Sequence, residues 1–173
     1  MNSHKPLSRK CRRSCLETAA GLLSRRDHAS AELAVKLRDR GFTEDEVSDT
    51  IEKLEESGYL SDARFAESYA RELTTQRFMG NFGAVMKMRQ RGVDESLARD
   101  AVDAASENMP ELQRAKDLLD RKFASRGELD EKLLRRAAGL LKRKGYASET
   151  IRKAMKYLKT STNDDTVIDD TEY

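Results

Sequence analysis

A short segment that recurs three times is the feature that most constrains this chain. In each copy basic residues precede a glycine, and an apolar residue follows it. The copies are 37–43, 88–94 and 141–147, so their glycines are 51 and 53 residues apart. Apolar residues also recur at the sixth and tenth positions after each glycine. A fixed period of this length predicts a tandem repeat. A single compact nine-helix globule is the alternative.

Helix-start signals divide each copy into three helices. Ser14 is followed three residues later by Glu17, and Thr43 by Glu46. Such pairs satisfy two of the amides that a helix start leaves unpaired. A glycine such as Gly41 can adopt the left-handed conformation that ends a helix. Together with apolar spacing, these signals predict helices over about 14–25, 30–40, 43–58, 61–76, 82–91, 94–106, 110–124, 128–144 and 147–159.

Composition agrees with an all-helical fold. Ala, Glu, Lys, Leu and Arg make up 87 of the 173 residues, whereas Ile and Val together number 9. A high content of Ala, Glu, Lys, Leu and Arg is typical of helical proteins. A low content of the β-branched residues Ile and Val disfavours a sheet. No apolar run approaches the roughly 20 residues that a membrane span needs. We therefore predict an all-α protein: three tandem three-helix repeats, at 15–60, 61–106 and 107–159, in an elongated, curved array.

The charge of the chain is unevenly distributed. The formal net charge is +2, but residues 1–14 carry five bases and no acid, and residues 160–173 carry five acids and no base. Neither end buries enough apolar area to offset chain entropy, so we expect two disordered tails. Without residues 160–173 the formal charge rises to +7. The basic start lacks an apolar segment after it, which argues against a secretory signal and favours a cytoplasmic protein.

No pattern of catalytic or metal-binding residues emerges. Cys11, Cys15, His4 and His28 are too irregularly spaced for an ordinary zinc finger, so we expect reduced thiols and no metal. Motifs for phosphate binding, dinucleotide binding and nucleophilic catalysis are absent from the sequence. His28 is interpreted as an exposed turn histidine. We expect no catalytic residue, no cofactor and no enzymatic activity.

The candidate binding residues are the basic side chains near the glycine steps and turns. Cations at a helix C-terminus are favoured by the helix dipole, and that explanation stays open. In a serial array the same positions would also form a basic stripe suited to a polyanion. The candidates are Arg25, Arg26, Arg38, Arg40, Arg77, Lys87, Arg89, Arg91, Lys142, Arg143 and Lys144.

Three apolar residues flank Arg77 on an expected linker. Phe78, Met79 and Phe82 come closest to the mixture of aromatic and basic residues that stacks on nucleic-acid bases. We favour a packing role for them over an exposed recognition role. The choice depends on which side chains the fold leaves exposed.

One block of the chain resembles the RecX family of regulators. Gly58-Tyr59-Leu60-Ser61-Asp62 is followed by Arg64, Phe65, Ala66 and Tyr69, in the pattern of that family. The stretch 25–33, the step at 37–42, the later Gly92-Val93 step and the element 115–122 fit it too. The resemblance covers about residues 15–159. Ala29 departs from it, because a serine is usual there and would cap the second helix; Ser30 is the nearest replacement.

The resemblance implies a monomeric protein that binds RecA and lies in the groove of RecA–single-stranded DNA filaments. Such a protein would restrain filament growth, ATP hydrolysis, strand exchange and co-protease activity, and so control the SOS response, DNA repair and homologous recombination. It would also bind single- or double-stranded DNA to some degree and make no membrane contact. The alternative function is a general helical-repeat nucleic-acid-binding protein. The family block is interpreted as mainly structural.

Overall fold

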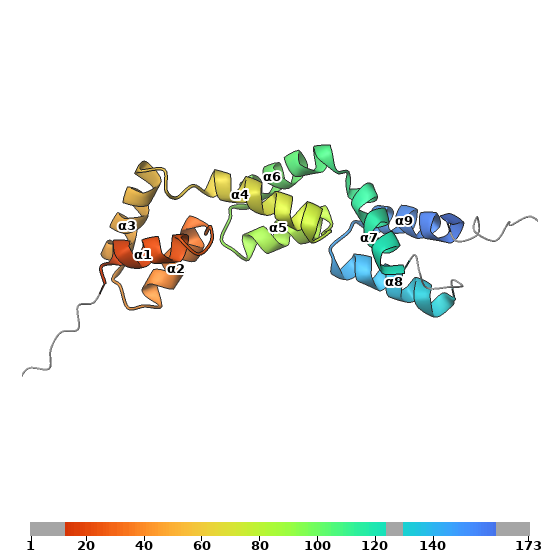
Figure 1. Ribbon diagram of the computed structural model, residues 1–173, viewed down its shortest axis with the longest axis horizontal. Coiled ribbons are helices and arrows are strands. Elements are labelled where there is room, and N and C mark those ends of the chain that lie inside the picture. Colours follow the sequence, from red (N-terminus) through yellow and green to blue (C-terminus); the bar gives the residue numbers. More distant parts are fainter. Residues whose placement is uncertain (1–12, 124–129, 162–173) are drawn as a thin grey trace, which may run out of the picture. The chain divides into compact units, whose positions relative to one another are not determined.

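The structure is a computed structural model, and it describes residues 13–123 and 130–161. Within these ranges every regular element is a helix (Figure 1). The all-α prediction is confirmed. The helices are α1 (Cys15–Leu23), α2 (Ser30–Arg38), α3 (Glu44–Glu56), α4 (Asp62–Arg71), a π-helical turn (Glu72–Gln76), α5 (Asn81–Arg89), α6 (Glu95–Asn108), α7 (Glu111–Phe123), α8 (Glu131–Arg143) and α9 (Ser148–Ser161). None of these helices is long and apolar enough to cross a membrane.

The described residues form two compact units, one ending at Asp62 and the other beginning at Ala63. The first unit packs α1, α2 and α3 against one another. Both predicted capping boxes are present, at the start of α1 and of α3. The core of this unit contains the buried side chains Cys15, Ala19, Leu33, Leu37, Val47, Leu54 and Leu60.

Three expectations for the first unit are wrong. Apolar spacing in the sequence places Leu16, Ala19, Ala20 and Leu23 on the first helix; Ala19 is buried, but Leu16 is 45% exposed and Ala20 is also exposed, because Cys15 joins Ala19 on the buried side of α1. From their position after the Gly58 stop, the sequence predicts that Tyr59 and Leu60 pack against the first repeat; Leu60 is buried, but Tyr59 is 75% exposed. His28 was expected at the surface but is only 4% exposed, and its Nδ1 lies 2.9 Å from the carbonyl oxygen of Arg26.

Helix α2 has a cap that comes from a distant residue. Its N-cap residue, Ala29, has no side-chain oxygen. The carboxylate of Asp62 takes this place and accepts hydrogen bonds from the backbone amide and the hydroxyl of Ser30, each at 2.7 Å. Ser30 therefore does not replace the missing serine as a cap; it is the first helical residue and a donor.

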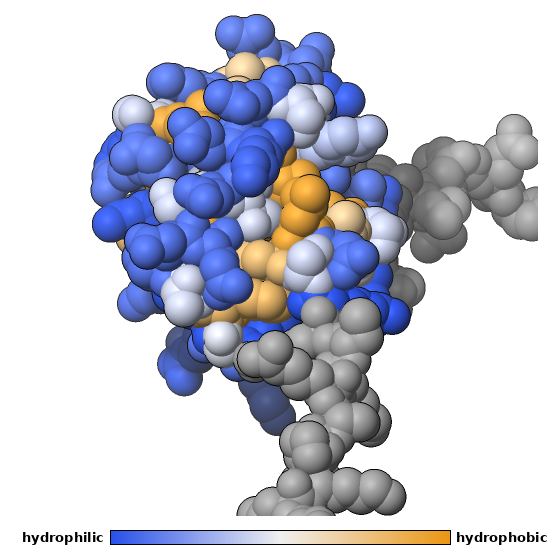
Figure 2. All heavy atoms as spheres, turned by 90° about the vertical axis from the view of Figure 1, so that its left-hand side faces the viewer, coloured by the Kyte–Doolittle hydropathy of each residue, from blue (hydrophilic) through white to orange (hydrophobic). Residues whose placement is uncertain are grey.

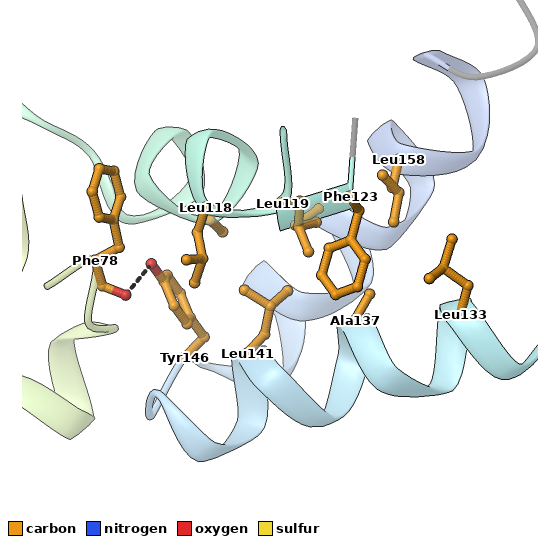
Figure 3. Close-up of a cluster of buried hydrophobic side chains, with 11 residues drawn as sticks. Phe78, Leu118, Leu119, Phe123, Leu133, Ala137, Leu141, Tyr146 and Leu158 are labelled. Atoms are coloured by element: carbon orange, nitrogen blue, oxygen red, sulfur yellow. Dashed lines mark hydrogen bonds between the residues drawn. The ribbon is translucent and has the colours of Figure 1, made fainter. Parts of the chain in front are cut away.

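The second unit contains α4 from Ala63 on, the π-helical turn and α5 to α9, and the π-helical turn packs on α5 and α6. Helices α7, α8 and α9 pack on one another and enclose a core of Leu118, Leu119, Phe123, Leu133, Ala137, Leu141 and Leu158 (Figure 3). Phe78 belongs to the same core, although it precedes α5. Its backbone is left-handed, with φ of 48°, and its carbonyl accepts a hydrogen bond of 2.9 Å from the hydroxyl of Tyr146 (Figure 3).

The glycine step after α8 docks on the start of α5. The amide of Gly80 donates to the carbonyl of Lys144 at 3.0 Å, and that of Gly83 donates to the carbonyl of Gly145 at 3.2 Å. A Cβ atom on Gly80 or Gly83 would overlap with this backbone. The second and third repeats are thus joined backbone to backbone within one unit.

All three glycine steps share one backbone conformation. Gly41, Gly92 and Gly145 have φ of 85°, 86° and 76°. In each, the amide after the glycine bonds back to the carbonyl five residues earlier, at 3.4, 3.2 and 3.2 Å. This is the left-handed helix stop that the sequence predicts. The apolar residue after the glycine is buried in the second and third steps (Val93 and Tyr146) and half-buried in the first (Phe42).

Candidate functional site

The glycine steps differ in how their first cation is compensated. In the first step Arg38 pairs with Glu44 at 2.5 Å, and in the second Arg89 pairs with Glu95 at 2.9 Å. In the third step, at the equivalent positions, Lys142 faces a helix that begins with Ser148 instead of a glutamate. Among the described residues Lys142 and Arg143 have no ion-pair partner. The third step therefore presents one cation, Lys142, whose counterparts are paired in the other two steps, and a second, Arg143, where those steps have Asp39 and Gln90.

The last cation of each glycine step interacts with another residue of the same unit. Arg40 donates to the carbonyl of Lys36 at 2.6 Å. Arg91 lies over the ring of Tyr69, 5.8 Å from the ring centre. The Nζ of Lys144 donates to the carbonyl of Arg77 at 2.5 Å. Burial lowers the pKa of Lys144, and the nearby charges of Arg77 and Lys122 add to this effect. Lys144 thus links the third repeat to the second through this hydrogen bond, in addition to carrying a charge.

The remaining predicted cations have local roles. Arg26 pairs with Glu32 at 2.5 Å and Arg77 pairs with Glu72 at 2.6 Å. Lys87 donates to the side chain of Gln90 at 3.1 Å, which leaves its charge unpaired. Arg25 is exposed. Of the predicted residues, Arg25, Arg26, Arg38 and Arg40 belong to the first unit, and the others belong to the second.

Three of the predicted cations line one groove in the second unit. The groove lies between α5 and the α8–α9 turn and has a volume of about 580 Å³. Lys87, Lys142 and Arg143 are its charged residues, and it has no acidic one. Its other lining residues are Met79, Phe82, Gly83, Met86, Gln90, Gly145, Tyr146, Ser148 and Ile151. We call this the basic groove.

Exposed apolar side chains accompany the cations of the basic groove. Phe82 is 69% exposed and Met86 is 36% exposed, both on α5. The packing role predicted for the cluster is correct for Phe78, which is buried and has the guanidinium of Arg121 4.5 Å from its ring centre. It is wrong for Phe82. Periodicity alone does not separate these two residues, because the left-handed turn at Phe78 sends them to opposite environments.

A neighbouring groove is electrically mixed. It has a volume of about 360 Å³ and shares Phe82 and Met86 with the basic groove. Arg89 and Arg99 line it together with Glu95, Asp103 and Glu111. Because acids and bases alternate there, it offers little attraction to a polyanion. The basic groove is the better candidate site.

Sequence reasoning missed a buried polar cluster in the second unit. Arg114 is fully buried and donates to the carbonyl of Met109 at 2.7 Å, to the hydroxyl of Ser106 at 3.1 Å and to the side-chain oxygen of Asn81. Burial lowers its pKa. Burial also raises the pKa of Tyr146 far above its ordinary value. An arginine on a polar helix carries no sequence signal for burial, so only the fold reveals that Arg114 is buried and hydrogen-bonded.

The residues of the family block serve structural roles in part. Gly58 has φ of 71° and ends the turn after α3. Asp62 caps α2, as described above. Phe65 and Tyr69 are buried and stacked, with ring centres 5.4 Å apart. Arg64 and Tyr59 are exposed.

The first unit also has an apolar groove. It lies between α1 and α3, has a volume of about 710 Å³, and includes Leu16, Leu23, Leu54 and Tyr59 in its lining. Figure 2, viewed from the side of this unit, shows apolar side chains gathered between hydrophilic ones. Asp27 and Lys53 are its only charged residues, so it has no net charge.

The described residues contain no group of three or more side chains arranged to hold a metal ion. Cys11 and His4 lie outside those residues, as do most of the two predicted tails. What the basic groove offers is three cations beside an exposed aromatic ring. Cations attract phosphates or carboxylates, and an exposed ring can stack on a base or pack against an apolar side chain.

Comparison with protein families gives three consecutive matches. Residues 15–54 match the first three-helix domain of RecX, residues 61–102 match the second, and residues 110–155 match the third. The matched segments follow the three repeats identified from the glycine steps.

Individual proteins agree with these matches. Regulatory protein RecX from Trichlorobacter lovleyi is 34% identical over 80% of this chain and 91% of its own length. Regulatory protein RecX from Stenotrophomonas maltophilia is 34% identical over 82% of this chain and 85% of its own length. The crystal structure of RecX from Lactobacillus salivarius, 21% identical, covers 84% of this chain and 95% of its own, with a TM-score of 0.69. It shows the same fold.

Proposed function

Because the chain belongs to the RecX family of regulatory proteins, we propose that it regulates RecA. It binds RecA and RecA–single-stranded DNA filaments, lies in the filament groove, and restrains ATP hydrolysis, strand exchange and co-protease activity. Family membership is the observation that carries this proposal. The protein acts by occupancy and performs no chemistry of its own.

The basic groove is the surface proposed to make the contact in the second unit. Lys87, Lys142 and Arg143 supply charge there, and Phe82 supplies exposed apolar area. The cations of the first unit would make further contacts. A filament presents the same surface repeatedly, so several weak contacts on one chain act together and strengthen binding beyond any one of them.

The direct test is the ATPase of RecA on circular single-stranded DNA, with this protein added below the RecA concentration. A regulator of filaments lowers the rate and co-sediments with preformed filaments. An unchanged rate together with no co-sedimentation would contradict the proposal.

A matched pair of variants tests the groove itself. Lys87→Glu with Lys142→Glu reverses two charges in the groove, and we expect at least a tenfold loss in inhibition. The control is Lys132→Glu with Arg136→Glu, which makes the same charge change at exposed positions of α8 outside the groove. Equal loss in both variants would mean that net charge, and not the groove, determines inhibition.

The mixture of Phe82 with three cations favours a second candidate function, direct binding of single-stranded nucleic acid. Stacking on an exposed ring beside phosphate-binding cations is typical of such proteins. A salt titration against single-stranded DNA without RecA separates the two. Tight binding with a steep salt dependence favours the second function. Weak binding that strengthens only when RecA is present favours the first.

A further inference from the structure

The basic groove continues along α9 as a row of cations. Arg152, Lys156 and Lys159 are four and three residues apart, so they share one face of the helix, and all three are exposed. Ser148, four residues before Arg152, lines the groove. The row thus runs from the groove to the last turn of α9.

One acidic residue of α9 lies near the start of this row. Glu149 is the only acid of the helix, and it pairs with Lys153 at 2.8 Å. Within the described residues Arg152, Lys156 and Lys159 have no ion-pair partner. With Lys87, Lys142 and Arg143 they make six cations without an ion-pair partner, although the charge of Arg152 also helps to lower the pKa of Glu149. Like charges so close together repel one another, and an acidic partner would relieve that repulsion.

The chain itself carries a segment of matching chemistry directly after α9. Residues 162–173 contain the acids Asp164, Asp165, Asp169, Asp170 and Glu172 and no base. Val167 and Ile168 lie between the two pairs of acids. The groove offers apolar partners for them in Phe82, Met86 and Ile151. The segment thus combines acidic and apolar residues, and the groove combines cations with apolar side chains.

The length of the segment is sufficient to reach the groove. Ser148 and Ser161 are the two ends of α9, and at about 1.5 Å per residue they are about 20 Å apart. An extended chain spans at most about 3.5 Å per residue. Asp169 is eight residues beyond Ser161, which gives it a reach of about 28 Å. The first acid pair can meet Lys159 and Lys156, and the last three acids can reach the groove.

We propose that residues 162–173 bind in cis along the cations of α9 and into the basic groove, where they compete with an external polyanion. This assigns the groove an acidic-peptide ligand and goes beyond the proposed function. It makes binding of an external partner conditional on displacing that segment.

Zero-length carbodiimide crosslinking of the full chain tests the contact directly, because the reagent joins only an amine and a carboxylate that touch. At about 0.1 M salt we expect crosslinks within monomers from Asp169, Asp170 or Glu172 to Lys87 or Lys142. At about 1 M salt, where screening acts within about 3 Å, their yield should fall severalfold. Crosslinks to Lys159 alone, or equal yields at Lys36 and Lys53 of the first unit, would overturn the proposal.

A binding measurement adds an independent readout. Changing the five acids of 162–173 to their amides should tighten binding of an oligo-dT probe by about fivefold, since an intramolecular ligand competes at high effective concentration. The control changes five exposed acids of α3 to amides (Asp45, Asp49, Glu52, Glu55 and Glu56), with the same change in net charge. Equal tightening in both variants would overturn the proposal. Neither measurement includes RecA, so both outcomes are independent of the proposed regulation of RecA, and the crosslinking is also independent of DNA binding.

Discussion

The carboxylate of Asp62 accepts two hydrogen bonds of 2.7 Å from Ser30, one from its backbone amide and one from its hydroxyl. The same arrangement recurs one repeat later, where Glu111 accepts a hydrogen bond of 2.8 Å from the amide of Asn81. Asp62 and Glu111 begin α4 and α7, and Ser30 and Asn81 begin α2 and α5. In the first two repeats the middle helix is thus capped by the first residue of the helix that opens the next repeat.

This relationship explains why the local caps of α2 and α5 are weak. Ala29 and Gly80 precede these helices and form no side-chain cap bond. In α8 of the third repeat, Asp130 provides its own cap, since its side chain accepts from the amide of Leu133 at 2.6 Å. The first two repeats therefore use a long-range cap and the third uses a local one.

Removing the long-range cap should destabilise the first unit. Asp62→Ala leaves the start of α2 without an acceptor, and we expect a loss of about 1 kcal/mol in the free energy of unfolding. Chemical denaturation measures it. Glu67→Ala is the control, because it breaks only an exposed pair with Arg71 that contributes under about 1 kcal/mol. Equal losses would show that the cap contributes nothing specific.

The contact between Gly83 and the Gly145 turn should not tolerate a side chain. A Cβ on Gly83 would overlap with the carbonyl of Lys144, and forcing in an extra methyl group costs about 1–3 kcal/mol. We expect Gly83→Ala to lower the thermal midpoint of the second unit and the protection of the Gly80 amide from hydrogen exchange.

Gly21→Ala is the matched control for that substitution. Gly21 is also helical, in α1, and a Cβ there would meet no other atom within 4 Å. Alanine favours a helix over glycine by up to about 1 kcal/mol, so this variant should be neutral or slightly stabilised. If Gly83→Ala left the thermal midpoint unchanged, the close contact between the start of α5 and the Gly145 turn would not contribute to stability.

Acidification should destabilise the first unit through His28. Burial lowers its pKa below the ordinary value of 6.5, and the charges of Arg26 and Lys36 act in the same direction, while its bond to the Arg26 carbonyl and the charge of Glu32 oppose them. As the pH falls through about 6.5, the unfolded chain binds a proton that the folded chain does not. Stability is therefore present above that pH and lost below it.

Thermal unfolding at pH values between 7.5 and 5 measures this loss. His28→Gln removes the titrating group, so its midpoint should change less over the same range. The exposed acids with lowered pKa values, such as Glu44 and Glu149, start from an ordinary value of 4.5 and lose their charge at lower pH. Parallel curves for the wild type and the variant would contradict the role of His28.

Phe82→Ala should separate binding from stability. Because Phe82 is 69% exposed, the free energy of unfolding should change by no more than about 0.5 kcal/mol. If its ring stacks on a base, the affinity for single-stranded DNA should fall by about 1–3 kcal/mol. Fluorescence anisotropy with an oligo-dT probe measures it. Val35→Ala, at a 52% exposed position of the first unit, should leave affinity unchanged.

Much of the fold follows from local signals in the sequence. The capping boxes at Ser14 and Thr43 act over three residues, and the left-handed stops at Gly41, Gly92 and Gly145 act over one turn. Such interactions depend on neighbours along the chain, so the pattern predicts them without knowledge of packing. The helices accordingly begin and end within a few residues of the predicted positions.

Burial was predicted less well, because it depends on contacts between distant segments. Spacing on α1 favours Leu16, Ala19 and Ala20 as core residues, but of these only Ala19 is buried, and the neighbouring helices cover Cys15 beside it. His28 and Arg114 are polar and yet buried. Each finds hydrogen-bond partners in the folded chain, which makes burial of a polar group tolerable.

The sequence by itself determined the repeat, the helices and the positions of the cations, because these depend on residue type and short spacing. Only the tertiary structure decided which cations remain available. Arg38 and Arg89 pair with acids six residues later, at the start of the next helix, Lys144 is held by a carbonyl 67 residues earlier, and Lys142 has no ion-pair partner among the described residues. A charge attracts a partner according to what surrounds it in space, and that is a property of the fold.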